Sequence, residues 1–184
     1  MESPDVPWAK RDDARVKSRR ADAPCRAALF FMEYLRSSGI SSGKMIDIGC
    51  GSGRNAIFFA QSGFEVHAVD HSEEVLKDMD LHGVMPHCHN VTDYWLFDDD
   101  FFPLAMDILC YGDEPDEKHR ISYRRELMRV MRRGGLFLLS VERRISRGRI
   151  EDEFSGFEVV ASEHAQDKVL GRTMDTLNLI LRKK

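Results

Sequence analysis

The stretch that decides the fold reads Lys44-Met-Ile-Asp-Ile-Gly-Cys-Gly-Ser-Gly-Arg-Asn-Ala-Ile-Phe-Phe-Ala-Gln-Ser-Gly-Phe-Glu-Val-His-Ala-Val-Asp-His-Ser-Glu-Glu-Val-Leu76. Residues 45–48 are strand formers and predict a short buried strand. The glycines at positions 49, 51 and 53 permit a tight turn and close approach of the backbone to a ligand. Residues 54–61 carry spaced apolar side chains that predict a helix, and residues 64–69 predict a second strand that ends in Asp70.

This order of strand, glycine turn, helix and strand is typical of a nucleoside site. A helix that begins at glycines leaves its first amide N–H groups free to meet a ligand. Asp70, at the tip of the second strand, can accept hydrogen bonds from both hydroxyls of a ribose.

The residues around the glycines indicate which nucleoside. Gly51-Ser-Gly53-Arg-Asn-Ala56 matches the fingerprint of dinucleotide sites. Asp47, however, stands just before the turn, where its carboxylate repels a pyrophosphate and suits a ligand that carries an ammonium and a sulfonium. We therefore expect a sulfonium nucleoside. A nicotinamide dinucleotide and a ligand-free glycine turn are the alternatives.

The segment from Asp47 to Asn55, Asp-Ile-Gly-Cys-Gly-Ser-Gly-Arg-Asn, resembles the first motif of the class I S-adenosylmethionine-dependent methyltransferases. It is most similar to the version in tellurite-resistance-type small methyltransferases, and the resemblance extends less closely to Glu142. It implies a three-layer α/β Rossmann-like fold, with a mostly parallel seven-stranded sheet and an antiparallel C-terminal hairpin. It also implies S-adenosyl-L-methionine as cofactor, bound by Asp47, Gly49, Cys50, Gly51, Gly53, Arg54, Asp70, His71, Asn90, Val91 and Tyr111.

Length and composition predict one soluble domain spanning residues 1–184. The chain is 42% hydrophobic and 32% charged, and its net charge of −4 implies no strong attraction of a polyanion. No apolar run reaches membrane-spanning length and no export signal is visible at the start, so we expect a cytoplasmic protein, a monomer or a homodimer. The cysteines at positions 25, 50, 88 and 110 are scattered, which favours reduced thiols.

The remaining elements follow from apolar patterning. Residues 1–21 are polar and predicted to be flexible; the resemblance suggests a lid that includes Trp8, Lys10 and Arg11, and a disordered tail is the alternative. Helices are predicted over residues 22–38, 72–83 and 116–132. Strands are predicted over 84–91, 104–111 and 136–141, the first at a sheet edge because Pro86 lacks an N–H group. Residues 157–161 and 176–181 predict an antiparallel pair.

The ends of the third and fourth predicted strands carry further candidate site residues. Asn90 falls where the resembled family has an acid that accepts a hydrogen bond from the adenine amino group, and an amide oxygen can replace it. A plain turn role is the alternative for Asn90. Tyr111, Asp113 and Glu114 lie just beyond the fourth strand and are candidates for the methionine end of the cofactor and for the acceptor; Tyr111 and Asp113 are the catalytic candidates. A connecting loop is the alternative there.

Two clusters look capable of binding a metal, but we expect no metal site. His82, His87, Cys88 and His89 crowd together, yet alternate residues of a strand face opposite ways. Three consecutive acids at 98–100 seldom converge on one ion and predict a solvated loop.

A basic segment spans residues 118–149, with eleven Lys and Arg against two acids. It could bind RNA or an anionic substrate, but a solvated helix face is the default. The candidates for nucleic-acid contact follow the fifth strand at the ligand end of the sheet: Arg143, Arg144, Arg147 and Arg149.

Methyl transfer from a sulfonium needs positioning and exclusion of water rather than covalent catalysis. Enzymes that methylate base amines typically show Asn or Asp-Pro-Pro-aromatic after the fourth strand, whereas this chain has Cys110-Tyr-Gly-Asp113. We therefore expect a small-molecule acceptor. The alternatives are an RNA or protein methyltransferase and a non-catalytic S-adenosylmethionine-binding module.

Overall fold

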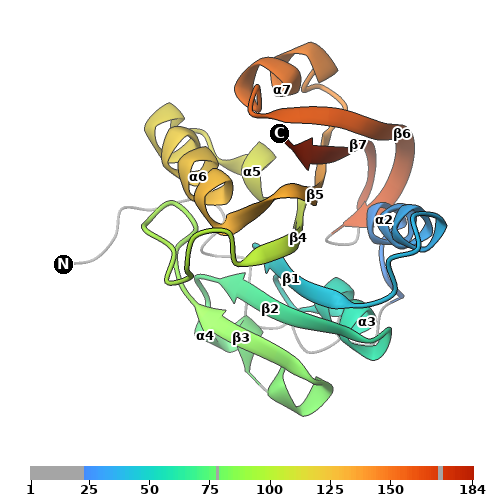
Figure 1. The fold of residues 1–184 in the computed structure, drawn as a ribbon, viewed down its shortest axis with the longest axis vertical. Helices are drawn as coiled ribbons and strands as arrows, with labels where there is room; N and C mark the ends of the chain where they lie inside the picture. Colours follow the sequence, from blue (N-terminus) through green and yellow to red (C-terminus); the bar gives the residue numbers. More distant parts are fainter. Residues whose placement is uncertain (1–22, 78, 170–171) are drawn as a thin grey trace.

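The computed structural model describes residues 23–77, 79–169 and 172–184, which form three layers with a sheet between helices (Figure 1). The strands of this sheet are β1 (Gly43–Ile48), β2 (Phe64–Asp70), β3 (Val84–Cys88), β4 (Phe102–Ile108), β5 (Met131–Glu142), β6 (Phe157–Val169) and β7 (Arg172–Lys183). The helices are α2 (Arg26–Ser37), α3 (Arg54–Gln61), α4 (Glu73–Leu76), α5 (Cys110–Asp113), α6 (Glu117–Val130) and α7 (Arg147–Glu153), with a 3₁₀ turn η1 (Asp80–His82).

The strand order in the seven-stranded sheet is β3-β2-β1-β4-β5-β7-β6. β1 to β5 pair in parallel, and β7 runs antiparallel to both β5 and β6. The predicted fold class is therefore confirmed, including the C-terminal hairpin. β3 lies at the edge, as Pro86 predicts.

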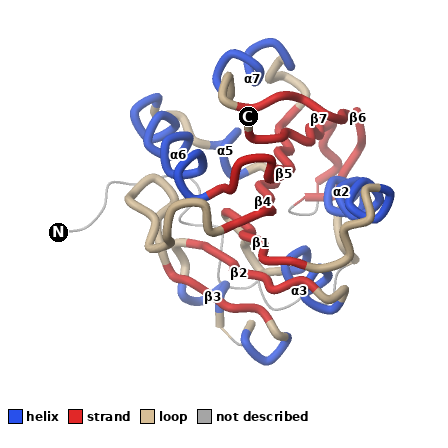
Figure 2. Tube along the Cα trace, viewed as in Figure 1, coloured by secondary structure: helices blue, strands red, loops and turns tan. Residues whose placement is uncertain are grey.

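The helices cover both faces of the sheet (Figure 2). On one face α2 and α3 pack against alternate strand residues such as Met45 and Met106. On the other face α6 and α7 pack against the residues between them, such as Ile46 and Ala105. Because both faces are covered, the central strands are apolar without a polar side, which is typical of a parallel sheet.

Several predicted boundaries are wrong. The helix expected over 72–83 is one turn, α4, followed by η1. The break accompanies the burial of Met79, whose methyl group packs against Gly53. The helix α7 was not predicted; its Ser146 side chain accepts a hydrogen bond from the amide of Arg149.

The ends of the chain also differ from the prediction. The first helix begins at Arg26 rather than at residue 22, so Pro24 precedes it. β6 and β7 are longer than predicted, because the hairpin continues through polar residues that carry little apolar signal. The lid residues Trp8, Lys10 and Arg11 lie outside the described residues, so the lid stays a prediction. No helix in the described part of the chain is long and apolar enough to cross a bilayer.

Candidate cofactor site

The glycine loop, residues 49–53, connects β1 to α3 at the carboxyl edge of the sheet. The amides of Gly49 and Cys50 both donate to the carbonyl of Val69, at 2.9 and 3.0 Å. The amide of Gly51 donates to Oδ2 of Asp70 at 2.9 Å. These bonds fix the loop to the end of β2.

The surroundings of the three glycines in the loop differ. All three have left-handed backbones, with φ of +69°, +53° and +79° at Gly49, Gly51 and Gly53. A Cβ atom added to Gly49 would lie 2.5 Å from Sγ of Cys110, and one added to Gly53 would lie 2.7 Å from Cε of Met79. A Cβ atom on Gly51 would meet no atom within 4 Å in the described structure. A side chain at Gly49 or Gly53 would therefore meet other side chains of the protein, whereas Gly51 presents bare backbone to open space.

Near its end, β1 carries a buried acid, Asp47, with one oxygen that lacks a partner among the described residues. Asp47 is 3% exposed, and its Oδ2 has no hydrogen-bond partner among the described residues. Burial, with the nearby charges of Asp107 and Asp70, raises the pKa of Asp47 to about 8. A buried carboxylate without a counter-charge is unfavourable. The position therefore suits a ligand cation.

Asp70 already has several protein partners. Its Oδ1 accepts from the amide of Ser72 at 3.1 Å and lies 3.2 Å from Nδ1 of His71, while Oδ2 accepts from Gly51. A carboxylate offers about four lone-pair sites, so acceptor capacity remains for ligand hydroxyls. Asp70 thus connects the glycine loop to the position predicted for the ribose.

Arg54 and Asn55, which follow the last glycine of the loop, contribute to the fold. Arg54 begins α3, and Oδ1 of Asn55 accepts a hydrogen bond of 3.0 Å from the amide of Cys25, just before α2. The Arg-Asn pair thus contributes to docking α2 beside the glycine loop.

A strained turn follows β4. Leu109 has a φ of +70°, which is unfavourable for a residue with a Cβ atom. Asp107 holds this turn by accepting from the amides of Cys110 and Tyr111 and, at 2.6 Å, from the hydroxyl of Tyr123. Burial raises the pKa of Asp107 to about 7, against the effect of these bonds. The turn lays Cys110 against Gly49, a contact that the sequence analysis missed.

The two thiols of the site are not activated. Burial, reinforced by neighbouring acids, raises the pKa of both Cys50 and Cys110 well above that of an ordinary thiol. Both groups are therefore neutral at neutral pH, and neither is a thiolate nucleophile.

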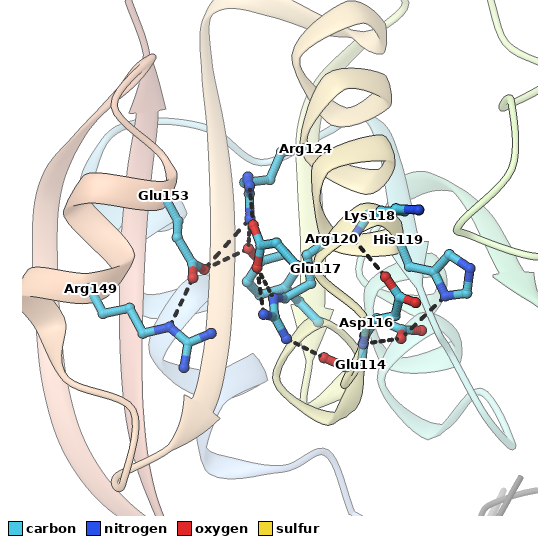
Figure 3. Close-up of polar contacts among 10 residues, drawn as sticks. Glu114, Asp116, Glu117, Lys118, His119, Arg120, Arg124, Arg149 and Glu153 are labelled. Atoms are coloured by element: carbon cyan, nitrogen blue, oxygen red, sulfur yellow. Dashed lines mark hydrogen bonds and ion pairs between the residues drawn. The ribbon is translucent and has the colours of Figure 1, made fainter.

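Tyr111 lies just past β4, as predicted, but its side chain is buried. The hydroxyl donates to Glu153 at 2.6 Å and accepts from Arg124, within a polar network between α6 and α7 (Figure 3). Asp113 is exposed, and Oε1 of Glu114 accepts from the amide of Asp116 at 2.8 Å. Catalytic roles for Tyr111 and Asp113 stay predictions, and the network gives Tyr111 a structural role.

The segment after β3 contains Asn90 and Val91, whose roles in cofactor binding stay predictions. Asn90 is exposed, and its Oδ1 already accepts from both the amide and the hydroxyl of Thr92. The carbonyl of Val91 accepts from the indole of Trp95. His89, by contrast, has a buried Nε2 without a partner in the described structure. From the sequence, His89 was a candidate only for a metal site, because nothing local marks a buried ring nitrogen without a partner.

One histidine of the predicted metal cluster, His87, pairs with His67 across two strands. Nδ1 of His67 on β2 lies 2.9 Å from Nε2 of His87 on β3, and burial lowers the pKa of both. Cys88 points elsewhere and donates to the carbonyl of His71. Within the described ranges, no group of three or more His, Cys, Asp and Glu is gathered closely enough to hold a metal.

The acids at 98–100 are exposed, as expected of a solvated loop, and two of them pair with basic residues. Asp99 pairs with Arg129 at 2.9 Å, and Asp100 pairs with Lys183 at 3.2 Å.

Most of the basic segment is neutralised by local acids. On α6, Arg124 pairs with Glu117. The candidates for nucleic-acid contact are largely paired as well: Arg144 with Glu142, Arg147 with Glu151 and Arg149 with Glu153. Arg143 is exposed after β5. These pairings support the solvated-surface interpretation of the segment.

The raised pKa of Asp47 predicts a pH dependence of stability. In the unfolded chain this carboxyl ionises near its ordinary pKa, so between about pH 4 and 8 the folded chain binds more protons. The free energy of unfolding should therefore fall as pH rises, by up to about 1.4 kcal/mol per pH unit for one group. Asp47→Asn should reduce that slope. Urea unfolding at pH 5, 6 and 7 measures it, and parallel profiles for the two proteins would refute the shift.

Comparisons with known proteins agree with the fold described above. Residues 35–92 match the family model described as tellurite resistance protein TehB. A methyltransferase structure from Methanosarcina mazei has a TM-score of 0.71 at 17% identity and covers 84% of this chain and 96% of its own. The 1,6-didemethyltoxoflavin-N1-methyltransferase of Burkholderia thailandensis has a TM-score of 0.72 at 19% identity, covering 92% and 81%. The fold is that of the class I S-adenosylmethionine-dependent methyltransferases.

Two further comparisons bear on how far this methyltransferase fold determines activity. A search of curated proteins found no match. The [4+2]-cyclase SpnF has a TM-score of 0.67 at 15% identity and covers 85% of this chain and 80% of its own. The methyltransferase fold therefore also occurs in a protein described as a cyclase, so function must be argued from the site itself.

Proposed function

We propose that the protein is an S-adenosylmethionine-dependent methyltransferase that acts on a small-molecule acceptor. The observation that carries the proposal is the buried Oδ2 of Asp47, which has no partner among the described residues, together with the open backbone of Gly51 in the loop that follows it. A ligand that combines a cation with a nucleoside matches both features.

The residues present fit the cofactor. The carboxylate of Asp47 would meet the amino-acid ammonium, and the remaining lone pairs of Asp70 would accept from the ribose hydroxyls. Gly51 leaves room for the ligand against the backbone. A bound cation would also favour the ionised form of Asp47, which burial disfavours in the free protein.

Methyl transfer from S-adenosylmethionine needs little covalent catalysis by the protein. When bound, S-adenosylmethionine supplies a methyl group on a positively charged sulfur, open to attack by an aligned nucleophile. The neutral thiols of Cys50 and Cys110 argue against a covalent enzyme intermediate. The side chains of this chain therefore act by binding, orienting and excluding water.

A small-molecule acceptor is supported by the state of the basic surface. RNA binding depends on Lys and Arg that are free to neutralise phosphates. Here Arg144, Arg147 and Arg149 pair with acids, so the positive field near the site is weakened. The Burkholderia structure, which holds S-adenosylhomocysteine together with 1,6-didemethyltoxoflavin, offers a precedent for a small acceptor on this fold.

Incubation of the purified protein with methyl-labelled S-adenosylmethionine and a fractionated cell extract tests the proposal. Label is expected in the small-molecule fraction. The Asp70→Ala variant, with its ribose contact removed, should transfer little label from the same mixture. Label confined to RNA or protein would contradict the small-molecule acceptor.

The second candidate is a module that binds S-adenosylmethionine without transferring its methyl group. It is favoured by Tyr111, whose hydroxyl is held by Glu153 and Arg124, and by the presence of the same fold in a cyclase. Tight cofactor binding with no labelled product in any fraction would support this alternative.

A further inference from the structure

We propose that the protein has a second binding site, for a small anion with an apolar body, at the edge of the sheet opposite the cofactor site. A cleft of about 400 Å³ lies there. It is formed where α2 ends and where β1, β4 and β5 begin, whereas the cofactor site lies where β1, β2 and β4 end. The cleft is therefore separate from the methyl-transfer site.

The size and walls of the cleft suit a small organic molecule. Pockets for small ligands typically have volumes of roughly 300 to 1,000 Å³ and mostly apolar walls. Here the apolar lining comes from Ile40, Pro103 and Leu136. These side chains can cover an aromatic or aliphatic body of a few rings or less.

The charged groups of the cleft are all positive. Arg132, Arg133 and Arg182 line it, and no acid is among its lining residues. The Nε atom of Arg132 donates to the carbonyl of Asp100 at 2.9 Å, and its terminal nitrogens have no other partner among the described residues. Arg133 makes no hydrogen bond or ion pair with the residues that the structure describes. Arg182 meets Glu158 at 3.3 Å, in a pair that is about half exposed on both sides.

Two of these arginines lie in an irregular part of β5, where the register against β4 shifts between Met131 and Leu136. A Cβ atom on Gly135 would lie 2.8 Å from the carbonyl of Arg132 and 2.9 Å from that of Pro103. This part of β5 thus packs directly against the start of β4, and Gly134 takes a left-handed backbone with a φ of +76°. This packing holds the backbone of Arg132 and Arg133 at the mouth of the cleft, which limits the entropy lost on binding.

Guanidinium groups recognise planar carboxylates and phosphates through paired N–H donors. Two neighbouring arginines beside an apolar wall therefore select a molecule with an anionic group at one end and an apolar body at the other. A phosphate ester and a carboxylic acid share this chemistry. The limited volume argues against a polymer as the occupant.

Calorimetric titration of the full chain with 1-naphthyl phosphate and with 1-naphthoate tests the site, and neutral 1-naphthamide serves as the isosteric control. Both anions are expected to bind, and the amide roughly tenfold more weakly or not at all. Arg133→Gln should lower anion affinity about tenfold. Arg125→Gln removes an equal charge from an exposed α6 position outside the cleft, and it should leave the affinity unchanged.

The amide chemical shifts of Gly134 and Gly135 locate the bound anion. They should change when either anion is added to the parent protein and stay unchanged in Arg133→Gln. Three results would overturn the proposal: no binding of the anions at millimolar concentration, equal binding of the neutral amide, or equal losses in the Arg133 and Arg125 variants. None of these results depends on the cofactor site.

Discussion

Replacing Gly51 with valine should abolish cofactor binding, with a loss of affinity of at least about a hundredfold. Gly51 has a left-handed backbone, which a β-branched residue adopts only with strain. Its added methyl groups would also project into the open space that we assign to the nucleoside. Titration with S-adenosylhomocysteine, which lacks the reactive methyl group, measures the loss without turnover.

Gly53→Ala is the matched control for the Gly51 variant. Its Cβ atom would meet the buried Met79 rather than the ligand, so the expected effect is on stability, roughly 1 to 3 kcal/mol. Urea unfolding should therefore separate the two variants. Retained affinity in a folded Gly51→Val protein would show that the ligand does not lie against this glycine.

Asp70→Ala should weaken cofactor binding by about 3 kcal/mol, since it removes charge-assisted hydrogen bonds to two ribose hydroxyls. The substitution also releases the amide of Gly51 and thereby loosens the loop. Binding of S-adenosylhomocysteine, followed by calorimetry, measures the sum of both effects.

Two variants separate the local contribution of Asp70 from its charge. Asp70→Asn keeps the shape and one acceptor oxygen, so its loss should be intermediate. Asp98→Ala removes an equal charge from an exposed loop and should leave binding unchanged. Unchanged affinity in Asp70→Ala would refute the ribose role. Equal losses of affinity in the Asp70 and Asp98 variants would show that the loss comes from long-range electrostatics and not from contact with the ribose.

The central fold was predictable because its signals are local. Residues 45–48 and 104–108 are short apolar runs, each interrupted only by one aspartate, as expected of strands buried on both faces, and Pro86 marks the sheet edge. The signal was weaker at the C-terminus. α7 buries Ile150 between charged residues, and β6 continues through polar residues, of which Ser162 and Gln166 are exposed while Asp167 is buried, so hydrophobic periodicity was weak in both segments.

The site was predictable only in its contiguous part. Asp47, the glycines and Asp70 belong to one motif, whose loop hydrogen bonds join neighbouring strands. The contact of Cys110 with Gly49 and the unpaired nitrogen of His89 depend on residues distant in the chain. For Tyr111, the predicted position just after β4 was correct. The sequence did not indicate, however, that its hydroxyl donates a hydrogen bond to Glu153.

We expect Asp47, Gly51 and Asp70 to hold a cationic sulfur nucleoside. Parallel calorimetric titrations of the purified protein with S-adenosylmethionine and with NAD distinguish this ligand from a dinucleotide. Saturable binding of S-adenosylmethionine, weakened by Asp70→Ala, is expected, with no binding of NAD. Absence of heat with S-adenosylmethionine at millimolar concentration, or tighter binding of NAD, would contradict this expectation.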